Sequence, residues 1–271
     1  MGMPDYIDLE LTSPWLNAAG MLGFAPGTED WPLDELQGGF VTNPISAVQR
    51  TPAESRAVLT YPGGALLHSG LPNPGLRAVL RKYGERWARS RLPIWVHLLA
   101  DGPDDVHRMA LVLEETEGVT ALEIGIPPGA PAELALGMLA AAVGELAVIA
   151  SLPLTAAGEP WLKELPGLGI RGVCLSAPRG ALFSRSGSSA KVGDHPIQGP
   201  DVPPVHGPEA RPVKGRLVGP GLFPQALAAL QTLLPLGLPV IAGSGVSSIE
   251  AGRELLSAGA AAVQLDTVLW M

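Results

Sequence analysis

The sequence is poor in cysteine and in charged residues. Cys174 is the single cysteine of 271 residues, so an intramolecular disulfide and a cysteine metal cluster are excluded. Charged residues make up only 16% of the chain, and the formal net charge is −8. An acidic balance of this size argues against a surface for nucleic acid or for an anionic membrane.

Long apolar runs are also missing. No run is long enough to cross a bilayer, and the N-terminal stretch MGMPDYIDLEL carries acids and no apolar signal core. We therefore expect a soluble, cytoplasmic protein with no nucleic-acid partner and no membrane partner.

Glycine and proline are abundant, with 34 and 28 residues, and they separate many short apolar runs. Several of these runs are almost wholly apolar, which is typical of strands buried on both faces. Helical patterns alternate with them. The predicted strands are 15–18, 39–45, 92–99, 119–126, 146–152, 170–176, 238–243 and 261–267. The predicted helices are 75–90, 103–117, 131–144, 158–165, 221–234 and 247–258.

This alternation predicts a parallel sheet with right-handed crossovers. Eight strands in a chain of this length favour a single-domain (β/α)8 TIM barrel over residues 1–271. The rival is an open doubly wound sheet, but no G-x-G-x-x-G motif opens the chain. Barrel active sites lie at the carboxyl ends of strands, so the unreactive turn PPGA (127–130) stands where reactive groups are expected.

Three local signals refine this picture. Asp101 is a predicted N-cap for the second helix, and Ser247 with Glu250 has capping-box spacing. Residues 178–219 are expected to form a long loop over the barrel mouth. Its histidines, His195 and His206, are interpreted as solvated, because a metal site would need more converging ligands. We expect no metal site.

Several stretches, in order along the chain, resemble the dihydroorotate dehydrogenase family, nearest to its soluble class 1. They are LTSPWLNAAG (11–20), GGFVTNPIS (38–46), LLHSGLPNPG (66–75), ALEIGIPPGA (121–130), KGRLVGPGLFP (214–224), PVIAGSGV (239–246) and AGAAAVQLDT (258–267). The resemblance implies oxidation of dihydroorotate to orotate on FMN, in pyrimidine biosynthesis. It also implies a cysteine or serine base, two lysines near the flavin, and asparagines that grip the substrate.

The residues at those functional positions differ from the family pattern. Pro128 stands at the position of the base, and Asn73 is the one substrate-binding asparagine that survives. Proline has no side-chain base, so the resemblance predicts a degenerate active site with no catalytic residue. His68 is a candidate replacement base, with an ordinary hydrogen-bonded histidine as the alternative. The other lost lysines and asparagines are replaced by Asn43, Leu67, Gly125, Ala130, Ser151 and Ser176.

The phosphate end of the cofactor site is better kept. Gly243, Ser244 and Gly245 end the seventh strand just before a helix, where backbone N–H groups suit a phosphate. Asp266 argues against this use, because its carboxylate replaces a family glycine. The alternative is that the glycines serve only tight turns. The further FMN contacts that the resemblance implies are Ala19, Gly20, Thr42, Gly219 and Thr267.

Three other side chains have a structural interpretation. His97 is expected in the core or at the barrel rim, and Cys174 is expected to be a small buried hydrophobe rather than a nucleophile. Glu123 lies inside a predicted strand and needs a partner, which Arg171 or Lys163 would supply.

Three functions remain open at this level. The first is a non-catalytic or regulatory subunit of the dihydroorotate dehydrogenase type, or a barrel that binds another small ligand. The second is an active FMN-dependent oxidoreductase of that family with altered substrate contacts. A third, another phosphate-ligand barrel enzyme, needs a base or a Schiff-base lysine at a strand end. The lysines considered, Lys163, Lys191 and Lys214, lie in predicted helix or loop.

The sequence ends at VLWM, directly after the eighth predicted strand. The resemblance implies a final helix that covers strands eight and one. We expect the uncovered face, with Val268, Leu269 and Trp270, to bind a second copy of the chain or another subunit. The alternative is that residues 1–11 fold across this face.

Overall fold

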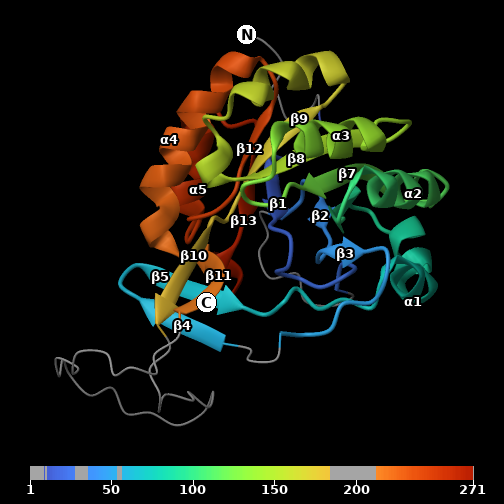
Figure 1. The fold of residues 1–271 in the computed structure, drawn as a ribbon, viewed down its shortest axis with the longest axis horizontal. Coiled ribbons are helices and arrows are strands. Elements are labelled where there is room, and N and C mark those ends of the chain that lie inside the picture. Colours follow the sequence, from blue (N-terminus) through green and yellow to red (C-terminus); the bar gives the residue numbers. More distant parts are fainter. Residues whose placement is uncertain (1–8, 10, 28–35, 54–56, 184–211, 271) are drawn as a thin grey trace.

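A computed structural model describes residues 9, 11–27, 36–53, 57–183 and 212–270 of the chain (Figure 1). Its centre is a path of eight parallel strands in the order β1-β13-β12-β9-β8-β7-β6-β2. The strands are β1 (Trp15–Asn17), β2 (Phe40–Val41), β6 (Ile94–Leu99), β7 (Val119–Gly125), β8 (Ala147–Pro153), β9 (Gly172–Ser176), β12 (Val240–Ala242) and β13 (Ala262–Leu265). All eight predicted strands are present, and the predicted (β/α)8 barrel is confirmed.

Strands β1 and β2 close the barrel with few backbone hydrogen bonds. A parallel bridge joins Leu16 to Gly39. Beyond it, the fully buried Asn17 side chain takes the place of a strand: its Nδ2 donates to Val41 O at 2.6 Å, and its Oδ1 accepts from Val41 N at 3.0 Å. A side-chain amide can do this because it has the same donor and acceptor as a peptide group.

The helices form the outer layer, with α1 to α3 on one side of Figure 1 and α4 and α5 on the other. The predicted helix 158–165 is instead the 3₁₀ helix η3 (Pro160–Leu168), which contains Pro166. The N-cap assignments are wrong by one residue: the cap residues are Gly102 and Ser248, and Ser248 Oγ accepts from Ala251 N at 3.1 Å. The α-helices are α1 (Leu76–Ala88), α2 (Pro103–Glu114), α3 (Ala132–Ala142), α4 (Phe223–Leu233) and α5 (Ile249–Ser257).

Apolar side chains fill part of the barrel interior. They come from every strand of the path and from the segment before β1, as expected for a packed rather than hollow barrel. Cys174 is one of them, in agreement with its interpretation as a small buried hydrophobe. The cluster contains Leu9, Leu11, Leu16, Ala19, Val41, Trp95, Ala121, Ile149, Cys174, Ile241, Ala261 and Ala262.

A second, antiparallel sheet lies at the other end of the barrel, and the sequence did not predict it. Its order is β10-β11-β5-β4, and it joins segments that are far apart in the chain (Figure 1). Two of its strands are the ends of the predicted 178–219 loop, and β10 starts just after β9 ends. Residues 184–211, with His195 and His206, lie outside the described residues. The strands are β4 (Ala57–Tyr61), β5 (Gly64–His68), β10 (Arg179–Phe183) and β11 (Pro212–Val218).

Five short elements complete the described chain. The strand β3 (Ile45–Ser46) pairs with the far end of β6. The 3₁₀ turns are η2 (Leu154–Ala156), η4 (Pro220–Leu222), η5 (Leu234–Leu236) and η6 (Thr267–Trp270). Among the described residues, no helix is both long and apolar enough to span a membrane.

Candidate functional site

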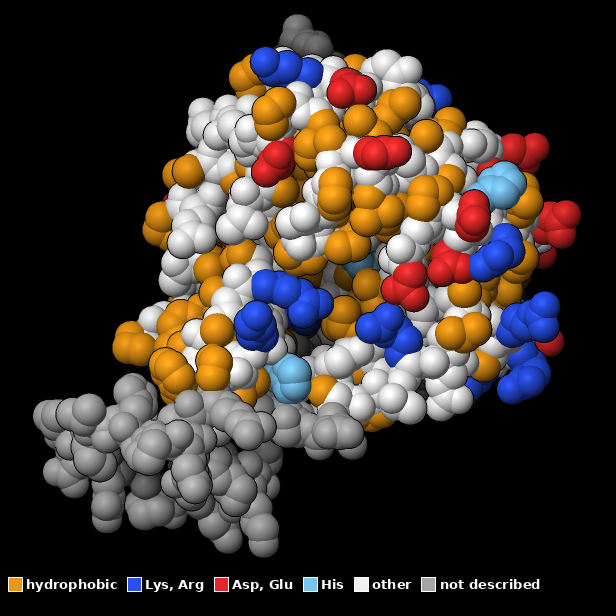
Figure 2. All heavy atoms as spheres, in the orientation of Figure 1, with side chains coloured by type: hydrophobic (Ala, Val, Ile, Leu, Met, Phe, Trp, Pro, Cys, Tyr) orange, Lys and Arg blue, Asp and Glu red, His pale blue; other side chains and the backbone are white. Residues whose placement is uncertain are grey.

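The mouth of the barrel, at the carboxyl ends of the strands, is where the sequence placed the site. Figure 2 shows Lys and Arg side chains gathered there beside the small sheet, around a hollow with a histidine at its edge. This is notable in a chain of net charge −8. Arg179 and Arg216 are direct cross-strand partners on β10 and β11, and Lys214 lies two residues from Arg216. Like charges placed opposite each other destabilise a sheet unless anions are near.

Asp266 provides such an anion, and it occupies the predicted phosphate cradle. The Gly245 N–H donates to Asp266 Oδ2 at 3.2 Å. The Thr267 N–H donates to Asp266 Oδ1, and the Thr267 hydroxyl donates to the same oxygen at 3.1 Å. Asp266 therefore does not point away from the cradle. Its carboxylate uses the backbone donors that the resemblance assigns to a phosphate.

Burial raises the pKa of Asp266 above its usual range, although these hydrogen bonds and the charge of Arg216 oppose the increase. For Arg216, burial lowers the pKa, and the charge of Asp266 partly offsets this effect while Arg179 adds to it. The charge of each group therefore shifts the pKa of the other at the mouth of the barrel.

The Arg216 guanidinium lies over the start of the predicted flavin site. Its NH1 group donates to Ala19 O at 3.2 Å. A Cβ added to Gly20 would lie 3.5 and 3.6 Å from the two terminal nitrogens of Arg216. The small residues Ala19 and Gly20 therefore leave room that Arg216 already fills. Sequence reasoning missed Arg216, although it lies in a quoted motif, because its position over Ala19 depends on the small sheet.

The cradle glycines also have packing reasons to be glycine. A Cβ on Gly243 would lie 2.5 Å from Leu175 O, and one on Gly245 would lie 2.5 Å from Phe223 N. Ser244, between them, has a φ of 71°, and its buried Oγ has no hydrogen-bond partner among the described residues. Gly219 has a φ of 121° and packs against the turn between β4 and β5, at Gly63 and Gly64.

Thr42 and Asn73, which the sequence predicted as ligand contacts, form hydrogen bonds with other groups of the chain instead. The Thr42 hydroxyl is fully buried and accepts from His97 N at 3.1 Å, which joins the end of β2 to β6. Asn73 Oδ1 accepts from Ser46 N, Ser46 Oγ and Gly75 N at 3.0–3.2 Å, and its Nδ2 donates to Leu71 O at 3.3 Å. The surviving asparagine thus holds the β3–α1 connection with its own amide.

His68 lies at the end of β5, half-buried. Its Nδ1 is 2.7 Å from Lys214 O. A carbonyl oxygen only accepts, so Nδ1 carries a proton in this arrangement. His68 therefore ties β5 to β11 and is an ordinary hydrogen-bonded histidine as well as a candidate base.

Below the mouth, the barrel interior contains a buried polar cluster of His97, Glu123 and Gln264. His97 Nδ1 is 2.9 Å from Glu123 Oε1, and Gln264 Nε2 donates to Glu123 Oε2 at 2.7 Å. The predicted partners of Glu123, Arg171 and Lys163, are wrong. Both are exposed, whereas His97 is the strand neighbour of Glu123 in the β6–β7 register. His97 and Glu123 both lie at inward-facing positions of adjacent strands, and this alternation in the sequence was the signal that could have predicted the pair.

Burial would raise the pKa of Glu123, but hydrogen bonds from His97 and Gln264 and the charge of His97 outweigh it, so the pKa is lowered. Burial and the Glu123 charge together raise the pKa of the Cys174 thiol well above its usual range. The carboxylate is therefore stabilised in its ionised form, and the thiol is not activated as a nucleophile.

The exit of β7 contains the turn that the resemblance compares with the catalytic loop. Ala130 N donates to Pro127 O at 3.0 Å, and Gly129 has a φ of 74°. Pro128 is exposed. At Gly125, an added Cβ would lie 2.9 Å from His97 Nε2, so the imidazole fills the space where a side chain would start.

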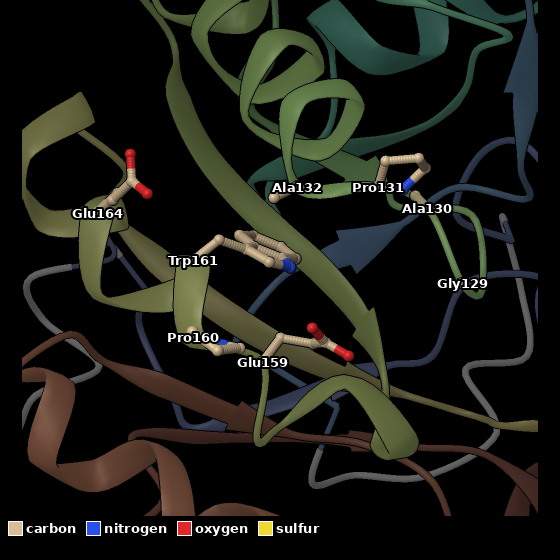
Figure 3. A pocket seen from close by; sticks show the side chains of 8 residues that line it. All are labelled: Gly129, Ala130, Pro131, Ala132, Glu159, Pro160, Trp161 and Glu164. Carbon is tan, nitrogen blue, oxygen red and sulfur yellow. The ribbon is translucent and has the colours of Figure 1, made fainter.

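A surface hollow of about 560 Å³ lies beside this turn (Figure 3). Trp161 forms its floor, between Glu159 and Glu164 of the η3 region on one side and the 129–132 turn on the other. None of the predicted cofactor-binding residues, nor Asn73, lines it, but Ala130, at the place of a family asparagine, does. Among the described residues, no group of three or more His, Cys, Asp or Glu side chains is placed to bind a metal.

The comparisons with known proteins identify the class and then the family. No protein-family model matches the chain. A crystal structure of DHODH in complex with ferulenol from Eimeria tenella superposes with a TM-score of 0.63 at 13% identity, over 95% of this chain and 76% of that one. This likeness shows the fold, an α/β barrel of the TIM type.

Two curated proteins extend the likeness to sequence. Both are named dihydroorotate dehydrogenase B (NAD(+)), catalytic subunit. The protein from Solidesulfovibrio magneticus is 31% identical over 277 residues, which cover 100% of this chain and 86% of that protein. The protein from Desulforudis audaxviator is 29% identical over 268 residues, which cover 96% and 83%. The chain belongs to the dihydroorotate dehydrogenase family.

Proposed function

We propose that this chain is a family member that does not oxidise dihydroorotate, and that it acts as a non-catalytic subunit or binds a different small ligand. The observation that carries the proposal is the exit of β7. Pro127, Pro128 and Gly129 form a turn with no proton acceptor at the position that the resemblance assigns to the base. Substrate oxidation of this type needs a base beside the carbon that loses its proton, so no rate enhancement from proton transfer is expected.

The neighbouring positions support the same conclusion. Asn73, which matches a substrate-binding asparagine, uses its amide to bind Ser46, Gly75 and Leu71. Asn43, at the place of a family lysine, accepts from Gly23 N at 3.1 Å. Ser151, at the place of the other lysine, is buried and carries no positive charge to favour a reduced flavin.

The test is an assay of orotate formation with excess FMN and with fumarate, NAD or quinone as acceptor. The Solidesulfovibrio magneticus relative, assayed in the same way, is the positive control. We expect orotate from the control and none above background from this chain. Orotate formation at an ordinary enzymatic rate would refute the proposal.

A second function has one observation in its favour. The Ser244 hydroxyl is buried at the cradle without a hydrogen-bond partner among the described residues, as expected of a group that serves a ligand. The chain would then be an active FMN-dependent oxidoreductase with altered substrate contacts. A yellow purified protein with flavin absorbance would favour this second function over the first.

The subunit part of the proposal concerns the C-terminal segment. The relatives are named as one subunit of an enzyme, and residues 268–270, with the sequence VLW, are apolar. We expect this segment to bind a second copy of the chain or another subunit. Light scattering should give a mass above 28.0 kDa, and Trp270→Asp should lower it. A 28.0 kDa monomer whose stability no partner changes would contradict the contact.

A further inference from the structure

Family membership implies FMN, so the first question is whether the residues at the mouth fit it. A flavin phosphate would need the backbone donors of the cradle. In this chain, Gly245 N and Thr267 N already donate to the two oxygens of Asp266. A carboxylate with two N–H donors is satisfied in the same way as a phosphate with two N–H donors. A phosphate entering here would lose these donors and would face a like charge.

The ring of the flavin meets a second obstruction. The floor of small residues, Ala19 and Gly20, is covered by the Arg216 guanidinium, which donates to Ala19 O at 3.2 Å. Its terminal nitrogens lie at ordinary contact distance from a Cβ position on Gly20. A planar ring cannot approach this backbone while the guanidinium is there.

The two obstructing side chains, Arg216 and Asp266, carry opposite charges, and each charge shifts the pKa of the other group toward its ionised form. Arg216 is fixed on β11 between β10 and β5, opposite Arg179 and Leu67. If Arg216 moved away, Asp266 would lose its opposite charge inside a buried cradle, and leaving a buried charge without a partner is costly. If Asp266 moved away, Gly245 N and Thr267 N would lose their acceptor. The Arg216 charge thus favours the ionised form of Asp266, and the backbone donors hold its carboxylate at the cradle.

We infer that Arg216 and Asp266 occupy the place of the flavin, so that two of the protein's own charged side chains fill the cofactor site. The residues present do not fit FMN. The basic mouth then contains an internal acid, Asp266, in place of a bound anion. This inference rests on the proposed loss of activity, but the two can fail separately.

The experiment uses the full chain and measures FMN binding by quenching of flavin fluorescence, with riboflavin as the ligand that lacks a phosphate. The variants are Asp266→Gly, Arg216→Gly and the double variant. The controls are Asp101→Gly and Arg179→Gly, which remove one exposed acid before α2 and the exposed cross-strand partner of Arg216. Circular dichroism confirms that each variant is folded. If the double variant does not fold, Arg216→Ala and Asp266→Ala replace it.

We expect no saturable FMN binding by the unaltered chain or by the controls. Asp266→Gly should gain FMN binding of at least about tenfold over the unaltered chain, a difference of about 1.4 kcal/mol. The gain should be absent with riboflavin, because the cradle serves the phosphate. Arg216→Gly should gain with both ligands, because it opens the ring floor.

Two results would overturn the inference. One is an unaltered chain that binds FMN saturably or purifies with bound flavin. The other is a set of folded variants that bind FMN no better than the unaltered chain. Bound FMN without orotate formation would overturn only this inference, whereas orotate formation would overturn the proposed function.

Discussion

Among the described residues, two carboxylates are buried, Glu123 within β7 and Asp266 just after β13, and their pKa values shift in opposite directions. Burial disfavours the charged form of both. At Glu123, side-chain donors from His97 and Gln264 reach both oxygens and outweigh burial. At Asp266, the donors are the Gly245 and Thr267 backbone N–H groups and one hydroxyl, and burial outweighs them.

We interpret this difference as the contrast between a structural cluster and the proposed cofactor site that Asp266 fills. The Glu123 cluster is built from side chains of three barrel strands that satisfy one another, so it belongs to the interior of the barrel. The Asp266 carboxylate instead sits on backbone donors next to an arginine, which is how a protein holds a bound anion.

Glu123→Ala should lower the free energy of unfolding by about 3–5 kcal/mol, because it leaves the His97 ring and the Gln264 amide buried without their acceptor. Urea denaturation measures this change. Glu117→Ala, which removes an exposed carboxylate just before β7, should change stability by less than about 0.5 kcal/mol. If both variants had the same small effect, the cluster would not stabilise the barrel.

The lowered pKa of Glu123 should be visible in the pH dependence of the free energy of unfolding. A lowered pKa in the folded state contributes stability above the ordinary glutamate pKa, and this contribution is lost as the pH falls through the folded pKa. Glu123→Gln should therefore reduce the acid-side slope, by up to about 1.4 kcal/mol per pH unit for one proton. Urea titrations at several pH values measure it. An unchanged slope would mean that Glu123 titrates normally.

Asp266→Asn should behave in the opposite way. A raised pKa means that the folded state holds the proton more tightly, so the wild-type contribution is favourable below the ordinary aspartate pKa and is lost as the pH rises through the folded pKa. As the pH rises through the folded pKa of Asp266, the wild type loses this contribution but the Asp266→Asn variant does not. The free energy of unfolding of the variant should therefore rise relative to that of the wild type. Near neutral pH we expect the two to differ by no more than about 1 kcal/mol. A large loss, as expected for Glu123→Ala, would remove the contrast.

The smallest effect concerns Cys174, whose thiol borders the Glu123 cluster. Burial and the nearby carboxylate raise its pKa well above the usual range, so the native protein should not react with a thiol reagent faster than it unfolds. The protein unfolded in denaturant should show its one thiol. Fast reaction in the native state would show that the barrel interior opens locally.

The parts of the fold that could be predicted are those whose signal is local. The eight parallel strands are short apolar runs, because strands covered on both faces must be apolar along their whole length. The small sheet was not predicted because its strands are short and part-exposed. Its pairing also joins Leu67 to Arg216, which are distant in sequence, and no local pattern encodes that pairing.

The candidate site shows the same division. The sequence alone identified the barrel and the family, because both follow from residue types along the strands and at their ends. It also predicted that Pro127 and Pro128 supply no base and that Asp266 conflicts with a phosphate. Only the tertiary structure decided that Asp266 turns onto Gly245 and Thr267, that Arg216 covers Ala19, and that Glu123 pairs with His97 and Gln264. Those contacts depend on strand register and on side-chain direction, which are determined when distant segments pack together.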